Sequence, residues 1–99
     1  MMNQIVLVGK IKGINYNDKE GTLYLEVTRI TKNDSGEYET DLFEVRTSIN
    51  IIKNVDDYCT IGDIIGVRGC LKTDKNKTYI SGDKITFLAS KKGKENEGE

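Results

Sequence analysis

Only one segment of this 99-residue chain has a helical hydrophobic pattern, and the other patterned segments are strand-like. Five short segments are rich in β-branched residues or alternate between apolar and polar residues, which is typical of β-strands. One segment between the third and the fourth has apolar residues at helical spacing instead. The predicted order is therefore β-β-β-α-β-β, with strands over residues 5–11, 23–30, 42–48, 64–72 and 79–88.

The helical segment follows Ser48. Ile51, Ile52, Val55 and Tyr58 recur at intervals that place them on one face of a helix. Either Ser48 or Asn50 can act as the N-cap. We expect Tyr58 to close the apolar stripe and lie in the core.

Turn-forming residues separate the predicted strands. Clusters of Asn, Asp, Lys, Ser and Gly occupy residues 13–21, 32–36 and 74–77, which predicts a long first loop and two further turns. Gly82 interrupts the last strand, where it predicts a bulge or bend.

This order predicts an all-β fold, a five-stranded OB-fold Greek-key barrel with one short helix between strands 3 and 4. An SH3-like barrel would not normally have a helix of about two turns at this point. We assign residues 1–90 to the barrel domain. Residues 91–99 carry no apolar side chain and are expected to be a disordered charged tail.

The composition argues against an enzyme. The chain has no histidine, which excludes histidine-containing triads and zincin motifs. Cys59 and Cys70 are separated by ten residues and match neither a redox pair nor a zinc-ligand spacing, so we interpret them as small apolar residues. Acidic groups such as Glu37, Glu39 and Asp41 are interpreted as solvated faces. The sequence predicts no catalytic residue, no metal site and no cofactor.

Fifteen basic and sixteen acidic residues give a net charge of −1. Any surface that binds anions must therefore arise from uneven placement of charge. No apolar run is long enough to span a membrane, and the first residues lack the features of a signal peptide. We expect a cytoplasmic, reduced protein with no membrane partner.

Two stretches of the chain resemble bacterial single-stranded DNA-binding proteins. Residues 2–11, with the sequence MNQIVLVGKI, are similar to the opening strand of that family. Residues 54–71, NVDDYCTIGDIIGVRGCL, are similar to its helix end, its K-G-D turn and its V-x-G-x-L strand, although Ile61 replaces the usual lysine. Asp41 and residues 43–45 fall where the family has its third strand. The similarity covers about residues 2–88.

The resemblance implies an OB-fold that forms homotetramers or homodimers and coats single-stranded DNA in replication, recombination and repair. In this family a basic groove neutralises phosphates and aromatic rings stack on bases. In an OB-fold the groove lies on the face of strands two and three, between the loops joining strands one to two and four to five. Here its walls would carry Tyr24, Glu26, Thr28 and Ile30, and opposite them Tyr38, Thr40, Leu42, Glu44 and Arg46.

The chain departs from the family in this groove. Ile30, Leu42 and Ser48 occupy positions where classical members have tryptophan or phenylalanine. The remaining rings for stacking are Tyr24, Tyr38 and Tyr79, and the alternative is that these rings only cover neighbouring strands. Glu26 and Glu44 would repel phosphate, and a cross-strand carboxylate could partly neutralise Arg46.

Basic residues are concentrated where a DNA backbone could run, and Arg46 and Arg68 are the strongest candidates because each interrupts an otherwise apolar strand. The alternative for each lysine is an ordinary solvated surface. The predicted nucleic-acid-binding residues are Lys10, Lys12, Tyr24, Ile30, Lys32, Tyr38, Leu42, Arg46, Ser48, Arg68, Lys72, Lys75, Lys77 and Tyr79.

The apolar character of the first strand on both faces predicts a homo-oligomer, since a single small barrel would leave Val6 or Val8 poorly covered. Partner proteins of replication or repair are possible, but the tail lacks the apolar end through which the family recruits them. The alternative function is an OB-fold protein-interaction module, of primosome or mobile-element type, with weak or no DNA binding.

Overall fold

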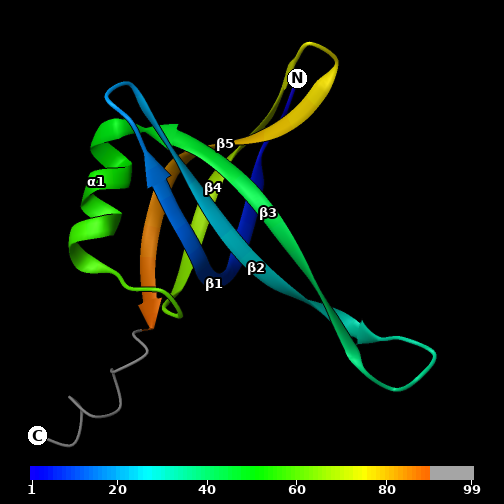
Figure 1. The fold of residues 1–99 in the computed structure, drawn as a ribbon. Helices are drawn as coiled ribbons and strands as arrows, with labels where there is room; N and C mark the ends of the chain where they lie inside the picture. Colours follow the sequence, from blue (N-terminus) through cyan, green and yellow to red (C-terminus); the bar gives the residue numbers. More distant parts are fainter. Residues whose placement is uncertain (90–99) are drawn as a thin grey trace, which may run out of the picture.

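The computed structural model describes residues 1–89, which form five strands and one helix in the predicted order (Figure 1). The predicted domain boundary at residue 90 and the predicted disorder of residues 91–99 lie outside the described residues. The elements are β1 Ile5–Tyr16, β2 Glu20–Lys32, β3 Tyr38–Ser48, α1 Ile49–Tyr58, β4 Ile64–Asp74 and β5 Lys77–Ala89.

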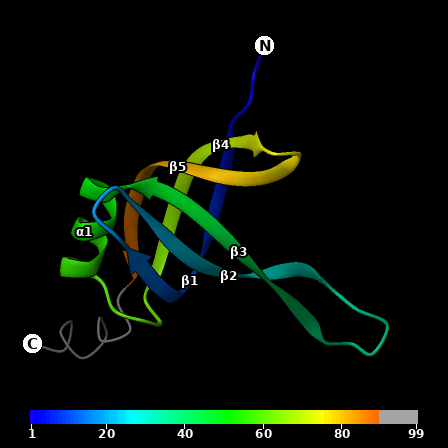
Figure 2. The same ribbon diagram turned by 45° about the horizontal axis from the view of Figure 1, so that its top comes forward.

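The strands close into a barrel in the order β1-β2-β3-β5-β4. Neighbouring strands are antiparallel except β3 and β5, which run parallel and pair only through Val45 with Ile80 and Arg46 with Ser81. β1 bends across the barrel, so its first half pairs with β4 and its second half with β2 (Figure 2). This is the predicted five-stranded OB-fold topology.

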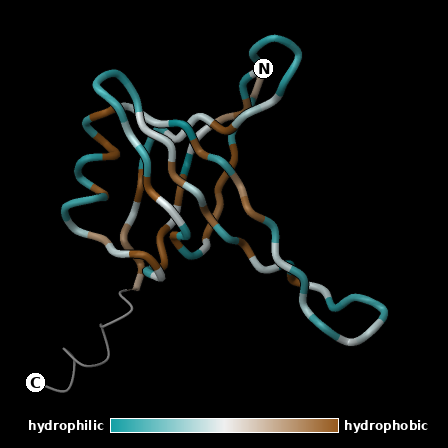
Figure 3. Tube along the Cα trace, viewed as in Figure 1, coloured by the Kyte–Doolittle hydropathy of each residue, from teal (hydrophilic) through white to brown (hydrophobic). Residues whose placement is uncertain are grey.

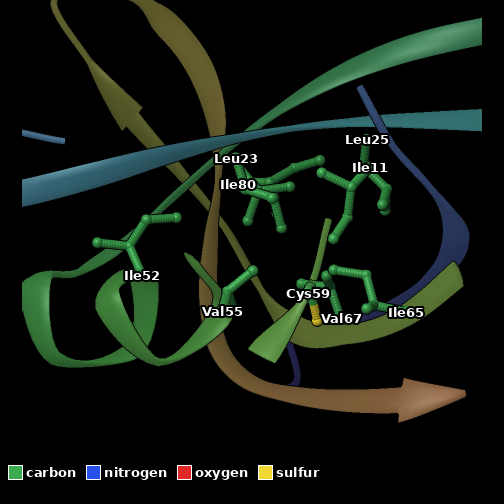
Figure 4. Packing of buried hydrophobic residues seen from close by; sticks show 10 residues of the cluster. Ile11, Leu23, Leu25, Ile52, Val55, Cys59, Ile65, Val67 and Ile80 are labelled. Atoms are coloured by element: carbon green, nitrogen blue, oxygen red, sulfur yellow. The ribbon is translucent and has the colours of Figure 1, made fainter. Parts of the chain in front are cut away.

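Alternate residues of the strands fill the barrel, as their period of two requires. The hydropathy of the chain accordingly alternates along the strands (Figure 3). Ten buried side chains, contributed by the strands, by the helix and by Cys59 just after it, form one cluster (Figure 4). They are Ile11, Leu23, Leu25, Val45, Ile52, Val55, Cys59, Ile65, Val67 and Ile80.

Helix α1 lies against one side of the barrel and buries Ile52 and Val55 (Figure 4). Ser48 is its N-cap, and the Ser48 Oγ accepts a hydrogen bond from the Ile51 amide at 3.4 Å. The prediction that Tyr58 lies in the core is wrong, because its side chain is 72% exposed. Cys59, one residue later, continues the buried stripe after Val55, and Tyr58 instead lies 6.4 Å from the ring of Phe87.

The two cysteines are free thiols, and Cys59 is buried. Burial and the nearby charge of Asp63 raise the pKa of Cys59, which keeps it protonated and unreactive. No helix among residues 1–89 has the length and apolar content needed to cross a membrane.

The first loop is much shorter than predicted, because β1 continues to Tyr16 and β2 begins at Glu20. Asn17 makes this tight turn possible, since its Oδ1 accepts hydrogen bonds from the amides of Lys19 and Glu20. These two hydrogen bonds thus close a short turn where the polar composition predicted a longer loop.

The bulge predicted at Gly82 is present. Opposite Arg68 and Gly69 of β4, the β5 partners are Lys84 and Gly82, so Asp83 is the extra residue. The strands approach closely here: a Cβ on Gly69 would meet the carbonyl oxygen of Ser81.

Two hairpins extend beyond the barrel. The far halves of β2 and β3 form a long arm, defined here as residues 27–42, that projects away from the barrel (Figures 1 and 2). The β4–β5 hairpin turns through Lys75 and Asn76, both with positive φ. The Asn3 side chain lies beside this hairpin, where it accepts a hydrogen bond from the Leu71 amide and donates one to the Leu71 carbonyl.

Candidate nucleic-acid interface

The outer face of β2 and β3 carries the residues predicted to wall the groove. Tyr24 pairs with Glu44, Glu26 with Leu42 and Thr28 with Thr40. Cross-strand partners project from the same face of a sheet, so these six side chains share one surface. Leu42 is 62% exposed there, and Tyr24 is the aromatic residue among these six. The surface is mixed in polarity, as its sequence suggested.

Arg46 continues this face toward the helix and contacts an aromatic ring. Its guanidinium carbon lies 4.3 Å from the centre of the Tyr79 ring on β5, which is a cation–π arrangement. The predicted neutralisation of Arg46 by a cross-strand carboxylate is not observed. Its partners across the strands are Thr22 and Ser81, and the ion pairs found among residues 1–89 belong to Lys12 and Arg29. Arg46 therefore has no ion-pair partner among residues 1–89.

A hollow of about 410 Å³ lies beside the Arg46–Tyr79 pair. It is bounded by the start of β2, the end of β3, the first turn of α1 and the bulge of β5. We call it the polar hollow, and its lining residues are Glu20, Arg46, Thr47, Ser48, Ile51, Tyr79, Ser81, Gly82 and Asp83. It thus brings together three predicted site residues, namely Arg46 and Ser48 at the end of β3 and Tyr79 on β5.

Two hydroxyl groups of the polar hollow already have structural partners. The Ser48 Oγ accepts the amide hydrogen of Ile51 at the helix N-terminus. The buried Thr47 Oγ1 donates to the Gly82 carbonyl at 3.0 Å and thereby joins β3 to β5. Ser48 is therefore explained by the fold as a helix cap, which was one of the two roles that the sequence allowed it.

Tyr79 also borders a second, more apolar hollow of about 260 Å³. Leu42 and Leu71 form part of its wall, and both are exposed. Tyr79 thus lies between a charged surface and an apolar one. Both surfaces suit a nucleic-acid strand, whose phosphates are charged and whose bases are flat and largely apolar.

The arm has a different electrostatic character. Arg29 binds Asp41 through two hydrogen bonds of 3.0 Å each, and its Nη1 lies 3.3 Å from Glu39. The hydrogen bond from Arg29 lowers the pKa of Asp41. Glu39 and Asp41 are therefore partners of an arginine and not only solvated acids. Over residues 29–41 there are two basic and four acidic side chains, so the arm does not attract phosphate.

Three predicted site residues, Ile30, Lys32 and Tyr38, lie toward the tip of this arm, away from the polar hollow, whereas Leu42 lies at its base. Ile30 is 93% exposed, and the Lys32 ammonium lies 5.6 Å from the centre of the Tyr38 ring. The structure thus pairs Lys32 with Tyr38 but separates both from Arg46 and Tyr79 (Figure 1).

The predicted lysines other than Lys32 fall into two groups. Lys10 and Lys12 lie on β1, where Lys12 is the extra residue of a bulge and approaches Glu26 at 3.6 Å. The second group surrounds the β4–β5 hairpin: Lys72 pairs across the strands with Tyr79, and Lys75 and Lys77 lie at the tip. This group extends the positive surface away from Arg46.

Arg68 does not join the Arg46 site. It lies on the outer face of β4, where Val6 and Lys84 are its cross-strand neighbours. There it lines a separate hollow of about 360 Å³, together with Val6, Val8 and Leu88. The two arginines that looked equivalent in sequence therefore occupy different surfaces.

Sequence reasoning missed Glu20 and Asp83, which reach the polar hollow from the start of β2 and the bulge of β5. Neither position carries a local signal, because the hollow forms only when β3 meets β5. The ion pair of Arg29 did have a signal: opposite charges lie at matching positions of two strands joined by a short turn.

Comparison with known proteins gives a consistent result. No family model matches the chain. Single-stranded DNA-binding protein 2 of Staphylococcus aureus strain Mu50 is 32% identical, and the match covers 92% of this chain and 75% of that protein. The fold is similar to the small single-stranded DNA-binding protein of Mycoplasma pneumoniae, with a TM-score of 0.67 and 20% identity over 86% of this chain and 85% of the other. It is also similar to a Plasmodium falciparum protein of this type, solved in complex with single-stranded DNA, with a TM-score of 0.66 and 23% identity over 89% and 96% of the two chains.

Proposed function

Because the chain belongs to the single-stranded DNA-binding protein family, we propose that it coats and protects single-stranded DNA during replication, recombination and repair. It is a binding protein and not an enzyme. The observation that carries the proposal is the half-buried Arg46–Tyr79 pair, which has no ion pair with a carboxylate among residues 1–89 and lies between two hollows.

Each part of this surface suits one part of a DNA strand. The hairpin lysines offer positive charge to phosphates, which supplies most of the affinity that does not depend on sequence. The Tyr79 ring and the guanidinium plane of Arg46 offer flat surfaces on which bases can stack, each stack contributing roughly 1–3 kcal/mol. Arg29 and Lys12 are engaged by carboxylates, so they contribute less to this positive surface than the hairpin lysines do.

We also propose that the protein acts as a homo-oligomer, either a tetramer or a dimer. Val6 and Val8 on β1 are 64% and 51% exposed, and Leu88 on β5 is 53% exposed. They line one hollow on the outer face of β1, β4 and β5. A small barrel with such an apolar face is stabilised when a second copy covers it.

The direct test of DNA binding is fluorescence anisotropy of a labelled oligothymidine over a series of salt concentrations. We expect saturable binding at about 50 mM salt and a steep loss of affinity as salt rises. Absence of saturable binding at low salt would refute the proposal. The variant Arg46→Ala should bind more weakly than the wild type under the same conditions.

The acidic arm favours a second candidate, in which the barrel is mainly a protein-interaction module. The single variant Arg46→Ala separates the two, because Arg68 lies on the surface proposed for assembly. A loss of DNA affinity supports the first function, whereas a change in partner binding alone, with DNA affinity intact, supports the second.

A further inference from the structure

The polar hollow contains more than the arginine and the ring that suit any DNA strand. Glu20, at the start of β2, and Asp83, in the bulge of β5, also line it. Among the described residues, neither carboxylate has an ion pair or a side-chain hydrogen bond. The site therefore combines one cation, one aromatic ring and two available acceptors.

Such a site is poorly suited to a phosphate group. Arg46 attracts a phosphate, but two carboxylates lining the same hollow repel it. A neutral, flat group with hydrogen-bond donors at its edge meets no such repulsion. It can lie against the guanidinium plane and donate to the carboxylates at its rim.

We propose that the polar hollow is a base-binding subsite that favours bases with an exocyclic amino group, such as cytosine, over thymine. The proposal rests on the DNA-binding function proposed above. Phosphates would follow the hairpin lysines, and one base would turn into the hollow beside Arg46.

The chemistry of the two pyrimidines explains the expected preference. Cytosine carries an N4 amino group, which donates hydrogen bonds, where thymine carries the acceptor O4. The amino group has two hydrogens and can donate to both Glu20 and Asp83, whereas thymine has one donor at this edge, its N3–H, and its O4 would face a carboxylate without a hydrogen between them. The hydroxyl hydrogen of Thr47 is already donated to the Gly82 carbonyl, so it does not compensate thymine.

The volume of the hollow is compatible with this role. Its roughly 410 Å³ falls in the range of small-ligand pockets, about 300–1,000 Å³. Arg46 is already held over Tyr79 before any ligand binds. The stacking surface is therefore largely preorganised, which lowers the entropic cost of binding.

The test compares oligodeoxycytidine and oligodeoxythymidine of equal length, measured by anisotropy with the full-length chain at neutral pH and one salt concentration. The measured quantity is the ratio of the two affinities, cytidine over thymidine. In the variants Asp83→Asn and Glu20→Gln a carboxylate becomes an amide of almost the same shape. We expect the ratio to fall about fivefold when both are combined, the size of one lost base contact.

Asp74→Asn is the matched control, because Asp74 lies in the β4–β5 hairpin near the lysines but does not line the hollow. Removing this carboxylate should strengthen binding of both oligomers equally and leave the ratio unchanged. Since Asp83 lies in a bulge, Glu20→Gln alone is the fallback if Asp83→Asn fails to fold.

The outcomes separate this proposal from the function on which it rests. A ratio that stays within about twofold of the wild type in the carboxylate variants, or that falls equally in Asp74→Asn, overturns the subsite while DNA binding stands. Failure of the wild type to bind either oligomer refutes the proposed function, and the subsite with it.

Discussion

Arg29 and Arg46 carry the same charge, but their neighbours give them different roles. Arg29 is held by two carboxylates across the arm, so its charge is cancelled within the protein. Arg46 lies over the Tyr79 ring, whose face attracts a cation but has no net charge with which to neutralise it. The position of an arginine relative to its cross-strand partners, more than its presence, therefore decides whether it can bind DNA.

We predict that Arg46→Lys weakens binding of oligothymidine by about three- to tenfold, roughly 1 kcal/mol, although the net charge is unchanged. An ammonium group has no flat surface for a base and is more strongly hydrated than a guanidinium. Anisotropy titrations at one salt concentration measure the effect. Arg29→Lys is the control, and a loss of affinity as large as that of Arg46→Lys would show that the planar group of Arg46 has no special part.

We predict that Arg29→Ala raises the pKa of Asp41 toward its ordinary value, because the hydrogen bond from Arg29 is what lowers it. A carboxyl group with a lowered pKa in the folded state stabilises the fold above its unfolded pKa, and this contribution disappears as the pH falls through the folded pKa. NMR titration of the side-chain carboxyl carbon follows the change. Arg68→Ala, on a different surface, should leave the Asp41 titration as it is in the wild type.

At the scale of elements, the β4–β5 ladder shows why glycine is required at one position and not at another. A Cβ on Gly69 would meet the backbone carbonyl of Ser81, which cannot rotate away. A Cβ on Gly66, on the same strand, would have its nearest neighbour at 3.5 Å, the terminal methyl of Leu88. The close approach at Gly69 lies next to the bulge that brings Asp83 to the polar hollow.

We therefore predict that Gly69→Ala lowers the free energy of unfolding by about 2 kcal/mol, in the range of overpacked sites. Thermal unfolding followed by circular dichroism should show a clearly lower midpoint. Gly66→Ala is the matched substitution and should unfold close to the wild-type temperature. Equal midpoints for the two variants would contradict the close approach.

Most of the element order could be predicted from sequence because alternation and helical spacing are local signals. Leu23 and Leu25 alternate with polar neighbours, and Ile52 with Val55 marks the helix. The first loop was predicted too long because the Asn17 side chain replaces loop residues through bonds that composition does not reveal. Tyr58 was misplaced because the helix ends there, so the stripe continues through Cys59.

The candidate site was less predictable than the fold. Arg46 and Tyr79 were both identified by residue type, but their contact depends on the short parallel pairing of β3 and β5, which joins segments distant in sequence. Glu20 and Asp83 carry no signal without that closure. Arg68 has the same type and strand parity as Arg46, and only the barrel shows that it lies among Val6, Val8 and Leu88.

At the scale of the whole molecule, polar and apolar functions occupy separate surfaces. The Arg46–Tyr79 region involves β3 and β5, and the exposed valines of β1 lie on the outer face shared with β4. This separation would allow one surface to bind DNA while the other is covered by a second copy. It also makes the two proposals independently testable.

We predict that Val8→Asp dissociates the homo-oligomer, because a charge buried between two barrels without a partner is strongly unfavourable. Size-exclusion chromatography with light scattering gives the mass of each species. Ile61→Asp introduces the same charge at an exposed position that does not line this hollow and should not change the mass. A wild-type protein that elutes as a monomer would refute the assembly.

The side chain of Asn3 fixes the position of the chain near its amino terminus. By bonding both backbone groups of Leu71, it holds Asn3 beside β4 within the β4–β5 hairpin, whose tip carries Lys75 and Lys77. A fluorophore attached at Met1 would therefore lie on the hairpin side of the barrel and could serve as an energy-transfer partner for a dye on the oligonucleotide. For the same reason, a bulky affinity tag at this end risks obstructing the strand that the protein binds.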